Sequence, residues 1–194
     1  MSEVAAGEAF CTEIDRTRDP FRLAIRGQQG LDQLLTAAIA ETLGGAHTVE
    51  LSSLRFPTRV DLAMALGAFP AAFGPALVEV NRVRNRFAHE PSAEFAGPEA
   101  QRLLGTLPDE AALQVRQQID DVSAEAPRTL AYVILVLFHL LQLSIAEHRD
   151  SRVVVDLAMG YVHKREADAP IPLTPETEEA IHKSREERAA EGRL

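Results

Sequence analysis

The sequence has little of what small secreted or metal-binding proteins depend on. It contains one cysteine, Cys11, so it cannot form an internal disulfide, and no other metal ligands are spaced around that thiol. The chain does not open with a basic segment followed by an apolar one, so we expect no signal peptide and a cytoplasmic location. Tryptophan is absent and aromatic residues make up 5% of the chain, while alanine and leucine abound, which favours packed helices over sheets.

Positive charge is also scarce. Lysines and arginines number 20 against 29 aspartates and glutamates, which gives a formal net charge of -9. This balance argues against a protein that coats nucleic acid or adheres to anionic membranes, but it leaves room for a locally basic site. The most apolar stretch, residues 130 to 146, is shorter than the roughly 20 residues of a membrane span, and it includes His139, Gln142 and Ser144. We expect this stretch to lie in a core or a dimer interface and not in a membrane.

What the chain does contain is a series of helical segments separated by proline and glycine. Asp19 and Pro20 form a start signal, as N-cap and first helical residue, and Gly44 ends that segment. Gly27 and Gly30 lie inside it and predict the close approach of a neighbouring helix. We expect helices over residues 2 to 18, 20 to 43, 58 to 69, 75 to 89 and 128 to 148, with Pro98 and Pro108 starting shorter ones.

These segments predict an all-α fold, an up-and-down helical bundle. We expect the bundle to occupy residues 1 to 165. Residues 166 to 194 hold three prolines and then a charged run with few large apolar side chains. We expect this second part to be a linker followed by an exposed, charged tail helix.

The sequence "VNRVRNRFAHE", Val80 to Glu90, gathers three arginines and a histidine in an otherwise acidic chain. Pro91 follows, and because a residue before proline disfavours the α region, the helix is expected to end near His89. A histidine at that position meets the negative end of the helix dipole, which favours its protonated form. The inward side of this helix is predicted to consist of Leu77, Val80, Val83 and Phe87.

Three side chains of this stretch suit the cleavage of a phosphodiester. His89 would move protons in general acid–base catalysis, and Arg84 would hold a phosphate through paired N–H donors. Asn85 is four residues before His89, so those two side chains can meet, but Arg84 lies about 140° around the helix from His89. A second copy of the chain would resolve that divergence. On RNA the attacking group could be the neighbouring 2′-hydroxyl, which requires no metal.

A plainer interpretation of the same stretch stays open. Basic residues in the last turn of a helix are an ordinary complement to its dipole. Arg82 and Arg86 are four residues apart and Glu79 precedes Arg82 by three, which is typical of a solvated face with an ion pair.

"RNRFAH", Arg84 to His89, resembles the motif of the HEPN superfamily, in which an arginine and a polar residue precede a histidine at this spacing. The surrounding segments "RGQQGLDQLLTAAIAETL", "LRFPTRVDLAMALGAF" and "FAGPEAQRLL" follow the order seen in mannitol-repressor-like members of that superfamily. The resemblance covers residues 22 to 145. It implies a helical bundle that forms a homodimer, with two motif copies brought together across the two-fold axis.

Many members of this superfamily are metal-independent endoribonucleases that act in stress response, as toxins, or in defence. The resemblance therefore implies that Arg84, Asn85 and His89 are catalytic, with Asp32 as an acid that would orient the site. It implies no cofactor and no metal, with RNA as substrate and an antitoxin or other protein as a further partner.

Other members have lost activity and serve as regulators or protein-interaction modules, so a non-catalytic, mannitol-repressor-like transcriptional or metabolic regulator is the alternative. Acids after the motif favour it, because a cleft that they lined would repel RNA. Residues 90 to 128 contain eight of them: Glu90, Glu94, Glu99, Asp109, Glu110, Asp120, Asp121 and Glu125.

Overall fold

The computed structural model describes residues 3 to 44, 50 to 90, 92 to 119 and 125 to 168, and the side chains of these ranges between residues 5 and 151. Every regular element in these ranges is helical, which confirms the predicted all-α class. The chain divides into two compact units, Met1–Arg152 and Val153–Leu194. Of the second unit the structure describes the continuation of one long helix. The predicted tail helix falls on residues 169 to 194, outside the described residues.

Two helices open the first unit. α1 is Glu3–Arg16 and α2 is Pro20–Thr42. Asp19 caps α2 as predicted, since its side chain accepts a hydrogen bond of 3.0 Å from the Phe21 backbone N–H. Gly44 follows the helix with a φ of 69°, a backbone conformation that glycine adopts without strain. Glu13 of α1 forms ion pairs with two arginines of α2, Arg22 at 2.9 Å and Arg26 at 3.2 Å, which link the two helices.

The middle of the unit consists of short helices around one longer helix. α3 is Phe56–Ala65, α4 is Gly74–His89, α5 is Gly97–Leu104 and α6 is Asp109–Gln117, with single 3-10 turns at Leu51–Ser53 (η1) and Ala71–Phe73 (η2). The helices begin where the prolines predicted starts: Pro57, Pro75 and Pro98 lie in first turns and Pro108 is the residue before α6. α4 packs against α2, α3 and α5, so its position is fixed from several sides.

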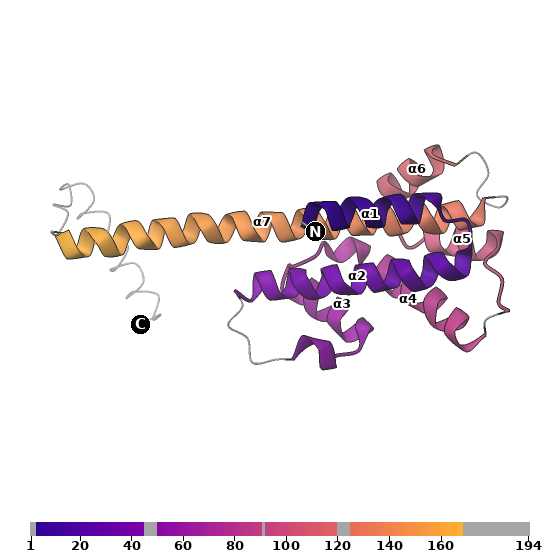
Figure 1. Cartoon of the computed structure of the whole chain (residues 1–194), viewed down its shortest axis with the longest axis horizontal. Coiled ribbons are helices and arrows are strands. Elements are labelled where there is room, and N and C mark those ends of the chain that lie inside the picture. The colour runs from indigo at the N-terminus through magenta and orange to yellow at the C-terminus, as the bar shows by residue number, and fades with distance from the viewer. Residues whose placement is uncertain (1–2, 45–49, 91, 120–124, 169–194) are drawn as a thin grey trace, which may run out of the picture. The chain divides into compact units, whose positions relative to one another are not determined.

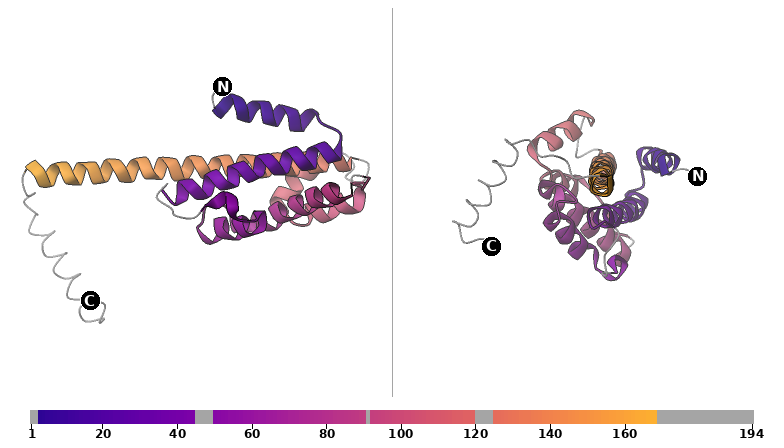
Figure 2. Two further views of the ribbon diagram at one scale, coloured as in Figure 1. Left: turned by 60° about the horizontal axis from the view of Figure 1, so that its bottom comes forward. Right: turned by 90° about the vertical axis from the view of Figure 1, so that its left-hand side faces the viewer.

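α7, Ala126–Asp168, is a single helix that includes the predicted 128 to 148 segment and continues beyond it. α1 and α2 both lie against its first part (Figure 1 and Figure 2). Phe10 of α1 stacks on Phe138 of α7 with ring centroids 4.4 Å apart. The two predicted close approaches are confirmed, because a Cβ added at Gly27 would lie 2.4 Å from Ile134, and one at Gly30 would lie 2.5 Å from Phe10.

The core is made of leucine, isoleucine, valine and phenylalanine side chains from all these helices. Within α7, Ala126–Ser151 is long and apolar enough to cross a membrane by length and composition. More than half of its most apolar window, 56%, is buried inside the bundle, which is compatible with the core helix of a soluble protein. The fully enclosed side chains include Leu23, Leu31, Leu35, Leu77, Leu103, Leu130 and Ile134.

One part of the apolar stretch is not in the core of the described chain. His139 is exposed, so of the two expected places, a core or a dimer interface, the structure excludes the core for this residue; its Nδ1 lies 2.7 Å from the Leu135 carbonyl oxygen of its own helix. Leu143, one turn later, is 60% exposed. The physical reason is helical geometry: with 3.6 residues per turn, a continuous apolar run surrounds the helix, while the neighbouring helices cover only part of its circumference.

Candidate functional site

The C-terminal half of α4 carries the candidate residues, and its inward side fixes their orientation. The predicted inward residues Leu77, Val80, Val83 and Phe87 are all buried, with at most 1% of any of them exposed. The helix ends at His89, as predicted, and the Glu90 backbone N–H donates the last bond of 2.8 Å to the Arg86 carbonyl oxygen. The outward residues of the last two turns therefore have a defined place on the surface.

Arg84 and Asn85 are brought together by the structure. Arg84 Nη1 donates a hydrogen bond of 3.0 Å to Asn85 Oδ1, and both residues are half-buried. Asn85 lies only about 40° around the helix from His89, since four residues at 100° each exceed one full turn by that amount. The bond to Asn85 therefore draws the Arg84 guanidinium towards the side of the helix that His89 occupies, which reduces the divergence expected from spacing alone.

His89 is the last residue of α4 and its side chain is exposed. Among the described residues it has no hydrogen bond or ion pair with Arg84, Asn85 or Asp32. The predicted side-chain contact between Asn85 and His89 is thus replaced by the bond from Arg84. Within one chain, the motif presents a paired Arg84–Asn85 group and a separate, solvent-facing imidazole.

The other two arginines of the motif are held by carboxylates. Arg82 donates from Nε and Nη2 to the two oxygens of Glu79, both at 2.7 Å, which confirms the predicted ion pair. Arg86 donates from Nη1 to Glu99 at 2.8 Å and from Nη2 to the Glu94 carbonyl oxygen at 2.6 Å. Arg86 is half-buried, so its assignment to a solvated face was wrong; α5, which supplies Glu99, covers it.

Arg84 differs from its two neighbours in this respect. Among the described residues no carboxylate pairs with it, and its one bonded partner is the neutral Asn85. A cation that is half-buried and has no counter-ion is suited to an anionic ligand, and a guanidinium matches a phosphate in geometry as well as charge. Arg84 is therefore the anion-binding candidate among the three arginines.

Asp32, the expected orienting acid, is engaged elsewhere. Its Oδ1 lies 2.5 Å from Nη2 of Arg59, a residue of α3 that is only 9% exposed. Arg59 Nη1 also donates to Thr36 Oγ1 at 3.2 Å. The structure thus places Asp32 in the contact between α2 and α3 and, within the described residues, gives it no bond to the α4 motif. Sequence reasoning missed Arg59 because it is 27 positions from Asp32 and no local pattern connects them.

The acids that follow the motif are partly neutralised. The hydrogen bond from Arg86 lowers the pKa of Glu99, so this carboxylate stays charged and paired. Glu125 forms an ion pair of 3.3 Å with Arg128, whereas Glu90 and Glu94 are exposed close to His89 along the chain. Asp109 and Glu110 lie in the first turn of α6. Asp120 and Asp121 are outside the described residues.

Glu79 is a buried acid with two arginine partners, of which the sequence predicted only Arg82. Burial raises its pKa, but hydrogen bonds from Arg82 and Arg102 outweigh burial and lower it. Arg102 Nε of α5 donates 2.9 Å to the same carboxylate. Because Arg102 is 23 residues away in the sequence, only the packing of α5 on α4 reveals the triad.

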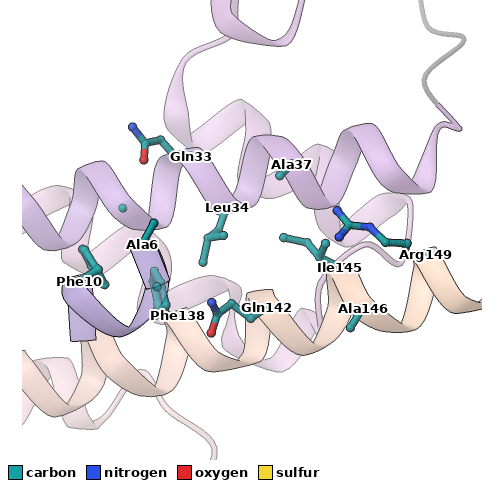
Figure 3. A pocket seen from close by; sticks show the side chains of 12 residues that line it. Ala6, Phe10, Gln33, Leu34, Ala37, Phe138, Gln142, Ile145, Ala146 and Arg149 are labelled. Carbon is teal, nitrogen blue, oxygen red and sulfur yellow. The ribbon is translucent and has the colours of Figure 1, made fainter. Parts of the chain in front are cut away.

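A separate cavity of about 470 Å³ lies between α1, α2 and α7, and no α4 residue lines it. Its walls are mostly apolar, and the side chains of Leu34 and Ile145 project into the space between α2 and α7 (Figure 3). The ring pair Phe10 and Phe138 closes one end, and Arg149, in an ion pair with Glu41, stands at the other. This cavity is a gap in helix packing and is unconnected with the candidate residues of α4.

The chemistry available on α4 is that of a cation, an amide and an imidazole. Among the described residues, no three histidine, cysteine, aspartate or glutamate side chains are grouped so that they could hold a metal ion. The α4 surface itself offers hydrogen-bond donors on Arg84 and Asn85 and an imidazole for proton transfer on His89. No protein-family model, curated protein or solved structure matches this chain.

Proposed function

We propose that the protein is a HEPN-like, metal-independent endoribonuclease that acts as a homodimer in a stress, toxin or defence role. The observation that carries the proposal is the state of the three arginines. Glu79 and Glu99 hold Arg82 and Arg86, whereas Arg84 is bonded only to Asn85 and stands on the motif that ends in an exposed histidine. The motif therefore offers one guanidinium that can bind a phosphate and, separately, one imidazole that can transfer a proton.

The reaction follows from these groups. The 2′-oxygen of a ribose attacks the adjacent phosphorus, the bond from phosphorus to the 5′-oxygen breaks, and a 2′,3′-cyclic phosphate and a 5′-hydroxyl form. One base accepts the proton of the 2′-hydroxyl and one acid protonates the leaving 5′-oxygen. Arg84 stabilises the charge on the phosphoryl oxygens in the transition state.

The need for two proton transfers supports the homodimer. A single copy offers one histidine at this helix end, and it is exposed and unbonded among the described residues. A two-fold pairing of the α4 ends would supply a second imidazole, so that one copy's histidine acts as base and the other's as acid. The Arg84–Asn85 groups of both copies would then flank the same phosphate.

The decisive experiment is cleavage of a single-stranded RNA by purified protein in EDTA. We expect wild-type protein to produce 2′,3′-cyclic phosphate ends and His89→Ala to lose a factor of about 10²–10⁴ in rate, the usual worth of a general acid or base. Arg84→Ala should lose a similar factor, because a charge-stabilising donor is removed. Arg116→Ala, an exposed arginine on α6, is the matched control and should cleave like wild type.

Expression in a host cell gives an independent readout. Wild-type protein should arrest growth and His89→Ala should not. Wild-type protein that leaves RNA intact, together with equal effects of both forms on growth, would refute the proposal.

A non-catalytic regulator or protein-interaction module is the second candidate. The observations in its favour are the exposed acids Glu90 and Glu94 next to the motif, which repel phosphates, and the exposed apolar side chain of Leu143 on α7, which is 60% exposed. If this candidate is right, Leu143→Glu will abolish the cellular effect while His89→Ala leaves it unchanged. The opposite pattern supports the enzyme.

A further inference from the structure

We propose that Arg82 and Arg102 form a second phosphate-binding site. It binds another backbone phosphate of the RNA strand that His89 and Arg84 bind, and it lies nearer the start of α4, away from Glu90. This inference rests on the proposed function and extends it. It assigns the substrate as a single strand long enough to reach both the Arg84–His89 group and the Arg82–Arg102 pair.

Glu79 builds the site. The residue is only 8% exposed, and its carboxylate accepts bonds from Arg82 Nε and Nη2 at 2.7 Å and from Arg102 Nε at 2.9 Å. A buried carboxylate with three such bonds fixes both guanidinium groups, which belong to different helices. Two long side chains that are already ordered lose less conformational freedom when a ligand binds.

The site retains a positive charge. Two guanidinium groups share one carboxylate, so the triad carries one net positive charge, and the lowered pKa of Glu79 keeps that balance at neutral pH. The side chains of Arg82 and Arg102 are 50% and 46% exposed, although the acid that orders them is buried. Among the described residues, Nη1 of Arg82 and both terminal nitrogens of Arg102 have no bonded acceptor, so they are available to a phosphate.

The site lies on the side of α4 that carries Asn85 and His89, and the bond to Asn85 draws the Arg84 guanidinium towards that side. Seven residues separate Arg82 from His89, which is two turns less about 20°, and Asn85 falls between them on the same side. The rise over seven residues is about 10 Å, too far for one phosphate group to bridge. The anion bound by the triad must therefore be a different phosphate of the strand that reaches His89.

The charges around α4 give the strand a direction. Glu90 and Glu94, just beyond the helix end, are exposed and repel phosphates, while Glu99 is neutralised by Arg86. A strand that leaves His89 towards Arg82 and Arg102 avoids the two exposed acids. The acidic segment after the motif thus restricts the path of the RNA and does not close the site.

The first test measures binding without cleavage. The probe is a fluorescent twelve-nucleotide 2′-O-methyl RNA, which lacks the attacking hydroxyl, and the readout is anisotropy at several salt concentrations. Arg102→Ala should weaken binding about tenfold and make the salt dependence shallower by about one unit of slope, the effect of one lost phosphate contact. Arg102 is the residue to change first, because Arg82 still neutralises Glu79 and the fold is retained; the melting temperature checks this. Arg116→Ala should bind like wild type.

The second test separates this site from the catalytic group. A dinucleoside monophosphate has one phosphate and cannot reach the triad, so Arg102→Ala should raise the KM for the twelve-nucleotide all-RNA strand about tenfold without a matching rise in the KM for the dinucleoside monophosphate. Unchanged binding and KM in a folded Arg102→Ala protein would overturn the inference. If wild-type protein cleaves nothing but Arg102→Ala still loses affinity for the probe, the phosphate site stands and the proposed activity fails.

Discussion

At Glu79, burial and ion pairing act on the pKa in opposite directions. Burial alone would favour the protonated acid, yet the bonds from Arg82 and Arg102 lower the pKa below its ordinary value. The outcome shows that a buried carboxylate is retained here as the common partner of two cations. Its substitution leaves those cations without an acceptor, so it affects stability as well as the surface charge.

Replacing Glu79 with glutamine should have an effect that depends on pH. Because its folded-state pKa lies below its unfolded value, the unfolded chain binds more protons, and this stability is complete above about pH 5 and lost as the pH falls through the folded pKa. Glu79→Gln should thus cost about 1–3 kcal/mol of unfolding free energy at pH 7, with a smaller difference from wild type at pH 3. Urea denaturation at both pH values measures it.

The control for this prediction is Glu147→Gln, an exposed acid in the middle of α7 and far from either helix end. It should change the unfolding free energy by less than about 0.5 kcal/mol at both pH values. A cost of Glu79→Gln that is the same at pH 7 and pH 3 would show that the charge of Glu79 is not what stabilises the fold.

At the scale of the elements, α2 depends on two glycines that face different neighbours. Gly27 meets Ile134 of α7, which is fully enclosed, and Gly30 meets Phe10 of α1, which is half-buried and borders the cavity. Replacing either glycine with alanine gains about 1 kcal/mol of helix propensity but requires the neighbour to move. Ile134 has nowhere to go, whereas Phe10 can shift into the adjoining space.

We therefore expect Gly27→Ala to destabilise the protein by about 1–3 kcal/mol, the usual cost of overpacking. Gly30→Ala should cost clearly less and can come out neutral, because the propensity gain offsets the displacement of Phe10. Gly105→Ala is the control, since its added Cβ would meet nothing closer than 3.4 Å. Equal costs for positions 27 and 30 in urea denaturation would show that the cavity gives no freedom to Phe10.

At the scale of the whole molecule, the proposed activity depends on the formation of a homodimer. A site that uses the histidines of both copies fails when either is missing, because a symmetric dimer brings the same helix end from each copy. The exposed residues of α7, such as Leu143 and His139, offer further surface on which copies can meet.

Mixing subunits tests this dependence. When wild-type and His89→Ala chains are unfolded and refolded together in equal amounts, activity should fall to about one quarter of that of the same total wild-type protein, since only pure wild-type dimers hold two histidines. Independent half-sites would leave about one half. The measurement is the initial rate of RNA cleavage, with sedimentation to confirm that mixed dimers form, and a result near one half would exclude a shared site.

The sequence by itself determined the helical class, the starts of the helices at their prolines and caps, the inward side of α4 and its end at His89. These depend on local rules, namely the 3.6-residue period, the restriction before Pro91 and the side-chain cap of Asp19, which a short segment carries within itself. The sequence did not predict that the Arg84 guanidinium lies towards the His89 side of α4, because that orientation depends on one side-chain hydrogen bond to Asn85.

Only the tertiary structure decided which charges are free. Three ion pairs join residues that are 13 to 27 positions apart in the sequence, and helix packing brings their members together: Asp32 with Arg59, Arg86 with Glu99, and Glu79 with Arg102. The same packing leaves His139 of the apolar run outside the core, a choice between core and dimer interface that the sequence alone left open. Ion pairs depend on distance in space and not on distance along the chain. The sequence therefore located the basic motif, and the packing of the helices determined that Arg84 is its arginine without a carboxylate partner among the described residues.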